Sequence, residues 1–243
     1  MRTVLFELCA ESLEAAEAAN FGGADRIELC SELSIGGVTP SLELLCATIK
    51  AISIPVHVLI RPRGGDFAYS ADEFGQMRRQ IEQAKQAGAS GVVTGVLLPN
   101  RCVDVARSRE LAELARPLAV TFHRAFDRAP NLSDALEAVI EIGADCLLTS
   151  GGKPDVLTGA DSIARLVQQG GSRLQIIAGG GLRMDSLVEI LRRTGVSCLH
   201  GSLLRRNETP GGNRAVLEAD VREAVRLLRR ECGDPAPATQ SVR

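Results

Sequence analysis

A fourfold internal repeat constrains the fold of this chain more than any other feature of its sequence. Each copy begins with Gly, continues with Ala or Val and then Asp or Ser, and ends in an apolar run: GADRIEL at Gly23, GASGVVT at Gly88, GADCLLT at Gly143 and GVSCLHG at Gly195. Each copy follows a segment with a helical pattern, so its Gly is expected to end a helix just before a buried strand. The copies lie about 50 to 65 residues apart, which is too long for one strand–helix unit and right for two.

Four further apolar segments supply the strands between the repeat copies. They are rich in β-branched residues and cover residues 4–10, 56–62, 118–124 and 174–180. Amphipathic helical segments separate the strands, for example residues 12–21, 70–88 and 131–143. Eight strands alternating with eight helices predict an all-parallel sheet, and eight near-equal units predict its closure into a (β/α)8 barrel, the TIM barrel. An open doubly wound sheet is the alternative.

The length of the chain fits one such barrel. It has 243 residues, and barrels of this class have about 250 as a single domain. We expect one domain over residues 1–232. Residues 233–243, GDPAPATQSVR, are rich in Pro and small residues and are expected to form a disordered tail.

Charge and composition argue against several classes of partner. The chain has 28 Lys and Arg against 30 Asp and Glu, so nothing electrostatic favours nucleic acid or an anionic membrane. No apolar run approaches the roughly 18 residues of a membrane span, and the N-terminus lacks a secretory signal pattern. The seven cysteines are an odd number and form no CxxC pair, so reduced thiols in a cytoplasmic protein are expected.

Polar side chains gather at the carboxyl ends of the predicted strands, where barrels of this class place their active sites. These residues are Glu7, Glu28, Arg61, Arg63, His123, Arg124 and Asp127. Side chains alternate along a strand, so Glu7 shares a face with Cys9, and Glu28 shares one with Cys30. If both faces point inward, two carboxylates lie close together and so do two thiols. The alternative to a functional site is a structural network of these carboxylates with the three arginines.

One interpretation of this barrel mouth is an enzyme that acts on a small anionic or phosphorylated substrate. The two glutamates would transfer protons, the three arginines would hold the anion, and His123 with Asp127 would form a second proton-transfer pair. Gly179–Gly181 and Ser202 would receive a phosphate through backbone N–H groups, unless the glycines only turn the chain. Isomerase, lyase and aldolase chemistry fit equally well.

A second interpretation concerns the cysteines. Cys9 and Cys30 combine a strand end with a matched partner, and two thiolates suit a soft ion such as Cu(I). The alternative is that both are small buried apolar residues, which is also what we expect of Cys146 and Cys198 at strand starts. Because CxxC and HxxxH spacings are absent, a closed tetrahedral zinc site is not expected.

Three other residues have less defined roles in the sequence. His57 lies at a strand start and is expected to be structural. His200 points into the mouth only if the eighth strand has the right phase, which the sequence leaves open. Lys153 follows the sixth strand and is either a Schiff-base lysine or, as we expect, an exposed loop residue.

Seven motifs, in order along the chain, resemble those of the CutC family. They are FELCAES (6–12), GGADRIELCSEL (22–33), GGVTPS (36–41), IRPRGGDFAYS (60–70), FHRAFD (122–127), LLTSGG (147–152) and LHGS (199–202). The resemblance implies a (β/α)8 barrel, a cytoplasmic location, and a homodimer or larger homo-oligomer. It also implies a part in copper homeostasis, with copper bound at cysteines that fall on Cys9 and Cys30. No organic cofactor is indicated.

Overall fold

The computed structural model describes residues 4–203 and 213–233, and eight parallel strands within them close into a barrel. Neighbouring strands pair in chain order, and the first also pairs with the last. The predicted (β/α)8 barrel is therefore confirmed. The strands are β1 (Leu5–Ala10), β2 (Arg26–Leu29), β3 (Val56–Leu59), β4 (Gly91–Thr94), β5 (Ala119–Phe122), β6 (Cys146–Thr149), β7 (Gln175–Gly179) and β8 (Cys198–Gly201).

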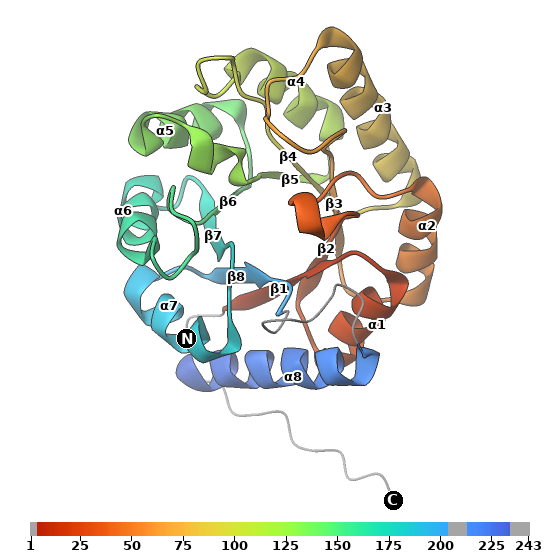
Figure 1. Ribbon diagram of the computed structural model, residues 1–243, viewed down its shortest axis with the longest axis vertical. Helices are drawn as coiled ribbons and strands as arrows, with labels where there is room; N and C mark the ends of the chain where they lie inside the picture. The colour runs from red at the N-terminus through yellow and green to blue at the C-terminus, as the bar shows by residue number, and fades with distance from the viewer. Residues whose placement is uncertain (1–3, 204–212, 234–243) are drawn as a thin grey trace, which may run out of the picture.

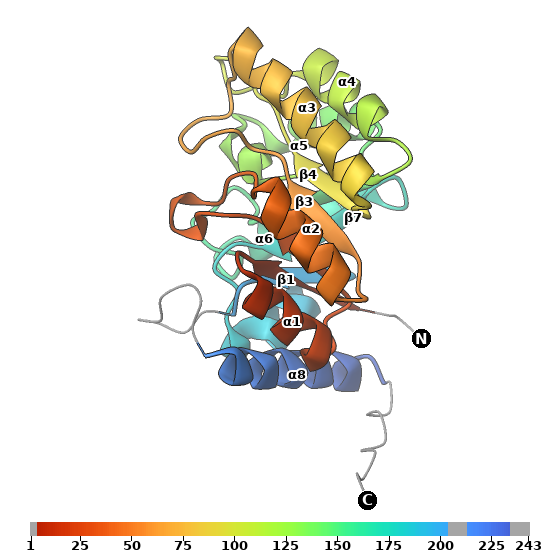
Figure 2. The same cartoon turned by 90° about the vertical axis from the view of Figure 1, so that its right-hand side faces the viewer.

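The helices surround the strands as an outer ring (Figure 1), and Figure 2 shows the same barrel from its side. Helix α8 packs against α1 and so completes this ring. None of the helices in the described part of the chain is long and apolar enough to cross a membrane. Residues 234–243, most of the predicted tail, lie outside the described residues. The helices are α1 (Leu13–Gly22), α2 (Leu42–Ala51), α3 (Ala71–Ala87), α4 (Val105–Ala115), α5 (Leu132–Ile142), α6 (Ala160–Gly170), α7 (Leu187–Thr194) and α8 (Arg214–Glu231).

The four repeat glycines end α1, α3, α5 and α7, as the sequence predicted. Gly23, Gly88, Gly143 and Gly195 all adopt the left-handed conformation, with φ between 70° and 90°. Glycine takes this conformation at little cost because it has no Cβ. Each glycine thus turns the chain from a helix into one of the even-numbered strands.

The aspartates of the repeat hold neighbouring strands together. Asp25 accepts a hydrogen bond at 2.8 Å from the backbone N–H of Phe6 in β1, and Asp145 accepts one at 2.7 Å from Val120 in β5. Each aspartate directly precedes an even-numbered strand and accepts its hydrogen bond from the strand before it. In these two copies, the repeat therefore contributes both the end of a helix and a contact between neighbouring strands.

The interior of the barrel is partly apolar and partly charged. Cys146 and Cys198 are buried among Leu5, Leu148 and Ile177, as expected, although the Cys146 thiol also donates a hydrogen bond to Gln175 and that of Cys198 accepts one from Arg26. His57 is also buried, and its pKa is lowered to about 4 by burial and by the charge of Arg26. Lys153 is exposed in the loop after β6, as expected.

Gly91 makes room for the His57 ring, and its replacement tests how tightly the interior is packed. A Cβ at position 91 would lie 2.7 Å from two ring atoms of His57. Gly91→Ala should therefore lower the free energy of unfolding by about 1–3 kcal/mol in urea denaturation. In the control Gly75→Ala, within α3, the nearest atom is 3.6 Å away on the flexible Arg79, so this change should stabilise by about 0.4–1 kcal/mol. Equal effects of the two substitutions would contradict this packing argument.

Candidate functional site at the barrel mouth

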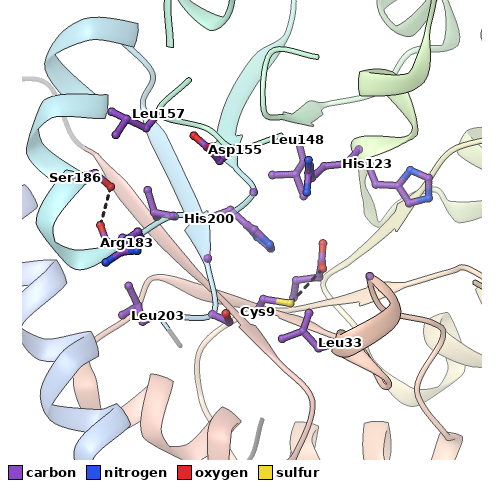
Figure 3. A pocket seen from close by; sticks show the side chains of 18 of the residues that line it. Cys9, Leu33, His123, Leu148, Asp155, Leu157, Arg183, Ser186, His200 and Leu203 are labelled. Carbon is purple, nitrogen blue, oxygen red and sulfur yellow. Dashed lines mark hydrogen bonds between the residues drawn. The ribbon is translucent and has the colours of Figure 1, made fainter. Parts of the chain in front are cut away.

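A cavity of about 1420 Å³ opens at the carboxyl ends of the strands (Figure 3). Barrels of this class place their ligand sites at this end. Of the predicted site residues, eight line the cavity: Cys9, Glu28, Arg61, His123, Arg124, Gly180, Gly181 and Ser202. The other five do not line it: Glu7, Cys30, Arg63, Asp127 and Gly179.

Glu7 lies one layer below the cavity floor and is only 1% exposed. Its neighbours in register are Arg26 on β2 and His200 on β8. One carboxylate oxygen accepts a hydrogen bond from the Arg26 guanidinium, and the other lies 2.7 Å from Nδ1 of His200. Burial alone would raise the pKa of Glu7, but the bond to His200 and the charges of His200 and Arg26 lower it to about 2. Glu7 is therefore a fixed anion.

Glu7 therefore belongs to a buried structural network, which was the alternative to a catalytic role. Its arginine partner is not one of the three that the sequence suggested. The partner is Arg26, whereas Arg61, Arg63 and Arg124 bind elsewhere. Arg26 lies two residues before Glu28 and so shares its inward face. The alternation of side chains along the strand was the signal that could have identified it.

Cys9, Glu28 and His200 converge just above this pair. The three are buried, and one ligand atom of each lies within 4.8 Å of the other two. Figure 3 shows His200 and Cys9 directed toward the same part of the cavity floor. The Cys9 thiol donates to one oxygen of Glu28 at 3.7 Å, and the other oxygen has no hydrogen-bond partner among the described residues. The direction of His200, open in the sequence, is thus inward.

The pKa values of the three residues in this cluster are all raised. Burial is the largest cause that raises the pKa of Glu28, and the negative charge of Glu7 adds to it. The hydrogen bond with Cys30, followed by burial, raises the pKa of Cys9 well above its usual value. For His200, burial lowers the pKa, but the charge of Glu28 and the bond to Glu7 outweigh this and raise it.

Cys30 lies behind Cys9, away from the cavity. The two sulfur atoms are 3.7 Å apart, so the thiols are in contact, as the alternation along neighbouring strands predicted. Leu33, Leu59 and Val93 pack around the pair. The two thiols therefore have apolar neighbours in addition to Glu28.

His123 and Asp127 do not form the predicted proton-transfer pair. The Asp127 carboxylate accepts hydrogen bonds from Thr149 Oγ1 at 2.5 Å and from Arg124 Nε at 3.0 Å, and so joins the loops after β5 and β6. His123 Nδ1 instead accepts from the backbone N–H of Ala125 at 3.3 Å. Burial and the charge of Arg61 lower the pKa of His123 to about 3, so its ring is neutral.

The predicted anion-binding arginines serve mainly to hold loops. Arg61 donates to the backbone carbonyls of Gly37 at 2.7 Å and Gly65 at 3.0 Å, and it also lines the cavity. Arg63 forms an ion pair with Glu73 at 2.6 Å, near the start of α3 and away from the cavity. Of the three arginines, only Arg61 and Arg124 can meet a ligand there.

The glycines after β7 permit close approach of side chains. A Cβ at Gly179 would lie 2.7 Å from Leu148 and 3.0 Å from His200. Gly180 has φ of 106°, and a Cβ there would lie 2.7 Å from Cζ of Arg124. Both contacts support the turning and packing role that was the alternative to phosphate binding.

Replacing Glu7 by Gln should destabilise the barrel by about 3–5 kcal/mol at neutral pH, because Arg26 would lose its buried counter-charge. The pKa of Glu7 is lowered to about 2, so its stabilisation is present above the ordinary value of 4.5 and is lost as pH falls toward 2. The difference between wild type and Glu7→Gln, measured by urea unfolding, should narrow over that range. A constant difference would contradict the charge argument, and the exposed control Glu137→Gln should change little.

Comparison with known proteins agrees with the sequence motifs. A sequence model of the CutC family matches residues 4–205. A family protein CutC from Caulobacter vibrioides is 41% identical over 93% of this chain and 97% of its own length, and one from Chromobacterium violaceum is 46% identical over 82% and 80%. The crystal structure of the proposed copper homeostasis protein CutC from Streptococcus agalactiae superposes with a TM-score of 0.79 at 29% identity, covering 83% of this chain and 100% of that one. The chain belongs to the CutC family.

Proposed function

We propose that this protein takes part in copper homeostasis by binding Cu(I) at Cys9 and Cys30. The observation that supports this is the contact of two buried thiols, with sulfur atoms 3.7 Å apart. Two thiolates at about 2.3 Å from one ion lie at most about 4.6 Å apart, so this separation suits a single shared ion. Thiolates are the ligands that Cu(I) prefers. The name of the Streptococcus agalactiae relative points the same way.

The surroundings of the two thiols suit a soft, weakly hydrated ion. Leu33, Leu59 and Val93 pack against the two cysteines and give them apolar neighbours. Cys9 lines the cavity whereas Cys30 lies behind it, so an ion would meet Cys9 first. Because the pKa of Cys9 is raised, metal binding must displace a proton from its thiol. Both thiols are free, which fits the reducing cytoplasm that we propose as the location.

A competition titration tests this proposal. The reduced protein is titrated with Cu(I) under nitrogen against bicinchoninate, beside the variant Cys9→Ala/Cys30→Ala. We expect one Cu(I) per chain, bound far more tightly than micromolar, and loss of this site in the variant. The matched control is Cys146→Ala/Cys198→Ala, which removes two cysteines equally buried in the barrel but away from the cavity. Weak binding by wild type, or retention by the Cys9/Cys30 variant, would refute the copper site.

We infer a second function, the binding of a small anionic molecule, from the size of the cavity. Its volume of about 1420 Å³ exceeds the roughly 300–1,000 Å³ of typical small-molecule pockets and far exceeds the needs of an ion. Arg124 lies in its wall, and Glu28, whose pKa burial raises, is a carboxyl group at its floor that could transfer protons. Isomerase, lyase or aldolase chemistry would use these groups.

Thermal unfolding with added ligand tests this second function. Inorganic phosphate and pyruvate, each at millimolar concentration and matched in ionic strength with sodium chloride, should raise the Tm of wild type if either binds. Arg124→Gln should abolish the shift, whereas Cys9→Ala/Cys30→Ala should preserve it. A shift that survives Arg124→Gln, or none with either probe, would count against an anion site at this wall.

A further inference from the structure

Three side chains of different chemistry meet at the cavity floor, and the copper proposal uses only one of them. Ligand atoms of Cys9, Glu28 and His200 lie within 4.8 Å of one another. They come from the three adjacent strands β1, β2 and β8, with Cys9 directly opposite Glu28 in the register. Strands in a closed barrel hold their side chains more rigidly than loops do, so the cluster is preorganised.

Glu28 presents an oxygen with no apparent structural purpose. Its Oε2 atom is buried and has no hydrogen-bond partner among the described residues. An unsatisfied buried polar atom destabilises the folded protein, so such atoms are rare without a role. A bound cation would satisfy it.

His200 is oriented to offer its second nitrogen. Nδ1 faces the Glu7 carboxylate at 2.7 Å and must carry a hydrogen to bond with this anion. In the neutral ring the lone pair is then on Nε2, which is free to coordinate an ion. A carboxylate behind a metal-binding histidine is the usual way in which proteins orient such a ligand, and Arg26 holds Glu7 in this position.

We propose that Cys9, Glu28 and His200 form a second metal site, for a borderline divalent ion of the Zn(II) type. A thiolate argues against Mg²⁺ and Ca²⁺, which take oxygen ligands, and Cu(I) has no need of a carboxylate. One thiolate and one carboxylate neutralise a divalent ion, which favours this charge in a buried site. Zn(II) with three protein ligands keeps an open position for water or substrate, and here the cavity lies beside the cluster.

This metal site and the proposed copper site share one ligand, Cys9, and in this respect the inference rests on the copper proposal. The sulfur atom of Cys9 lies 3.7 Å from Cys30 on one side and 3.7 Å from Glu28 on the other. A divalent ion that takes the Cys9 thiolate therefore competes with Cu(I) for it. The two sites differ in their remaining ligands, so they can be separated by mutation.

The test uses the full-length, reduced, metal-free protein and measures each ion by itself. Zn(II) affinity is determined against a chromophoric chelator, and Co(II), whose visible spectrum reports sulfur ligation and coordination number, serves as a spectroscopic substitute. Wild type should bind one Zn(II) more tightly than micromolar and give a Co(II) spectrum with a thiolate charge-transfer band. His200→Ala and Glu28→Gln should each weaken Zn(II) binding by at least about 100-fold, since loss of a ligand exceeds the effect of an outer partner.

Cys30→Ser separates this inference from the copper proposal. It should retain Zn(II) and the Co(II) spectrum while losing Cu(I), whereas His200→Ala should retain Cu(I) while losing Zn(II). His200→Gln serves as a second variant if the alanine protein unfolds, as judged by its thermal transition. Unchanged Zn(II) binding in His200→Ala and Glu28→Gln, or loss of it in Cys30→Ser alone, would overturn the mixed site. In that case the copper proposal would still stand, provided that only the cysteine substitutions abolish Cu(I) binding.

Discussion

The buried carboxylate of Glu7 is the constraint on which the barrel mouth depends. An ionised group inside a protein costs several kcal/mol unless charges and hydrogen bonds compensate for its lost hydration. Arg26 and His200 provide this compensation from the two strands that flank β1. The same contacts fix the direction of the His200 ring. Glu7 does not line the cavity, yet it determines how His200 is oriented at the cavity floor.

Glu7 and Glu28 show how one barrel can shift the pKa values of two buried carboxyl groups in opposite directions. Burial raises the pKa of both. Glu7 has two cationic hydrogen-bond partners that reverse this effect, whereas Glu28 has a weak thiol donor and a carboxylate nearby. The same burial therefore ends in opposite pKa shifts, because the two carboxyl groups have different neighbours. A metal ion that binds the Cys9 thiol must displace its proton, since the pKa of this thiol is raised as well.

Local chemistry made the fold predictable from the sequence. The repeat glycines carry the signal for the end of a helix, and it was correct at all four copies because a left-handed residue depends on little beyond its own backbone. Strand alternation likewise predicted the contact of Cys9 with Cys30, since both side chains lie on the inward faces of neighbouring strands, although the residue directly opposite Cys9 is Glu28. Both inferences required only short-range geometry.

The rest of the site depended on geometry that the sequence does not carry. His123 and Asp127 are near in sequence, but a 3-10 helix over Arg124–Arg128 carries Asp127 toward the loop after β6. The inward direction of His200 followed from the phase of β8, which is set by pairing with β1 and β7. Arg26 lies at the start of β2, so the polar residues at the carboxyl ends of the strands do not point to it.

The absence of CxxC and HxxxH spacings argued only against a closed tetrahedral zinc site, not against ligands contributed by separate strands. CxxC and HxxxH spacings describe ligands that one loop or one helix presents together. A closed barrel brings ligands together differently, because the ends of β1, β2 and β8 meet although Cys9 and His200 are far apart in the chain. Cys9 is on the central strand of these three, with its sulfur in contact with both Cys30 and Glu28. Its position therefore makes it the residue through which a soft ion and a borderline ion would compete in this barrel.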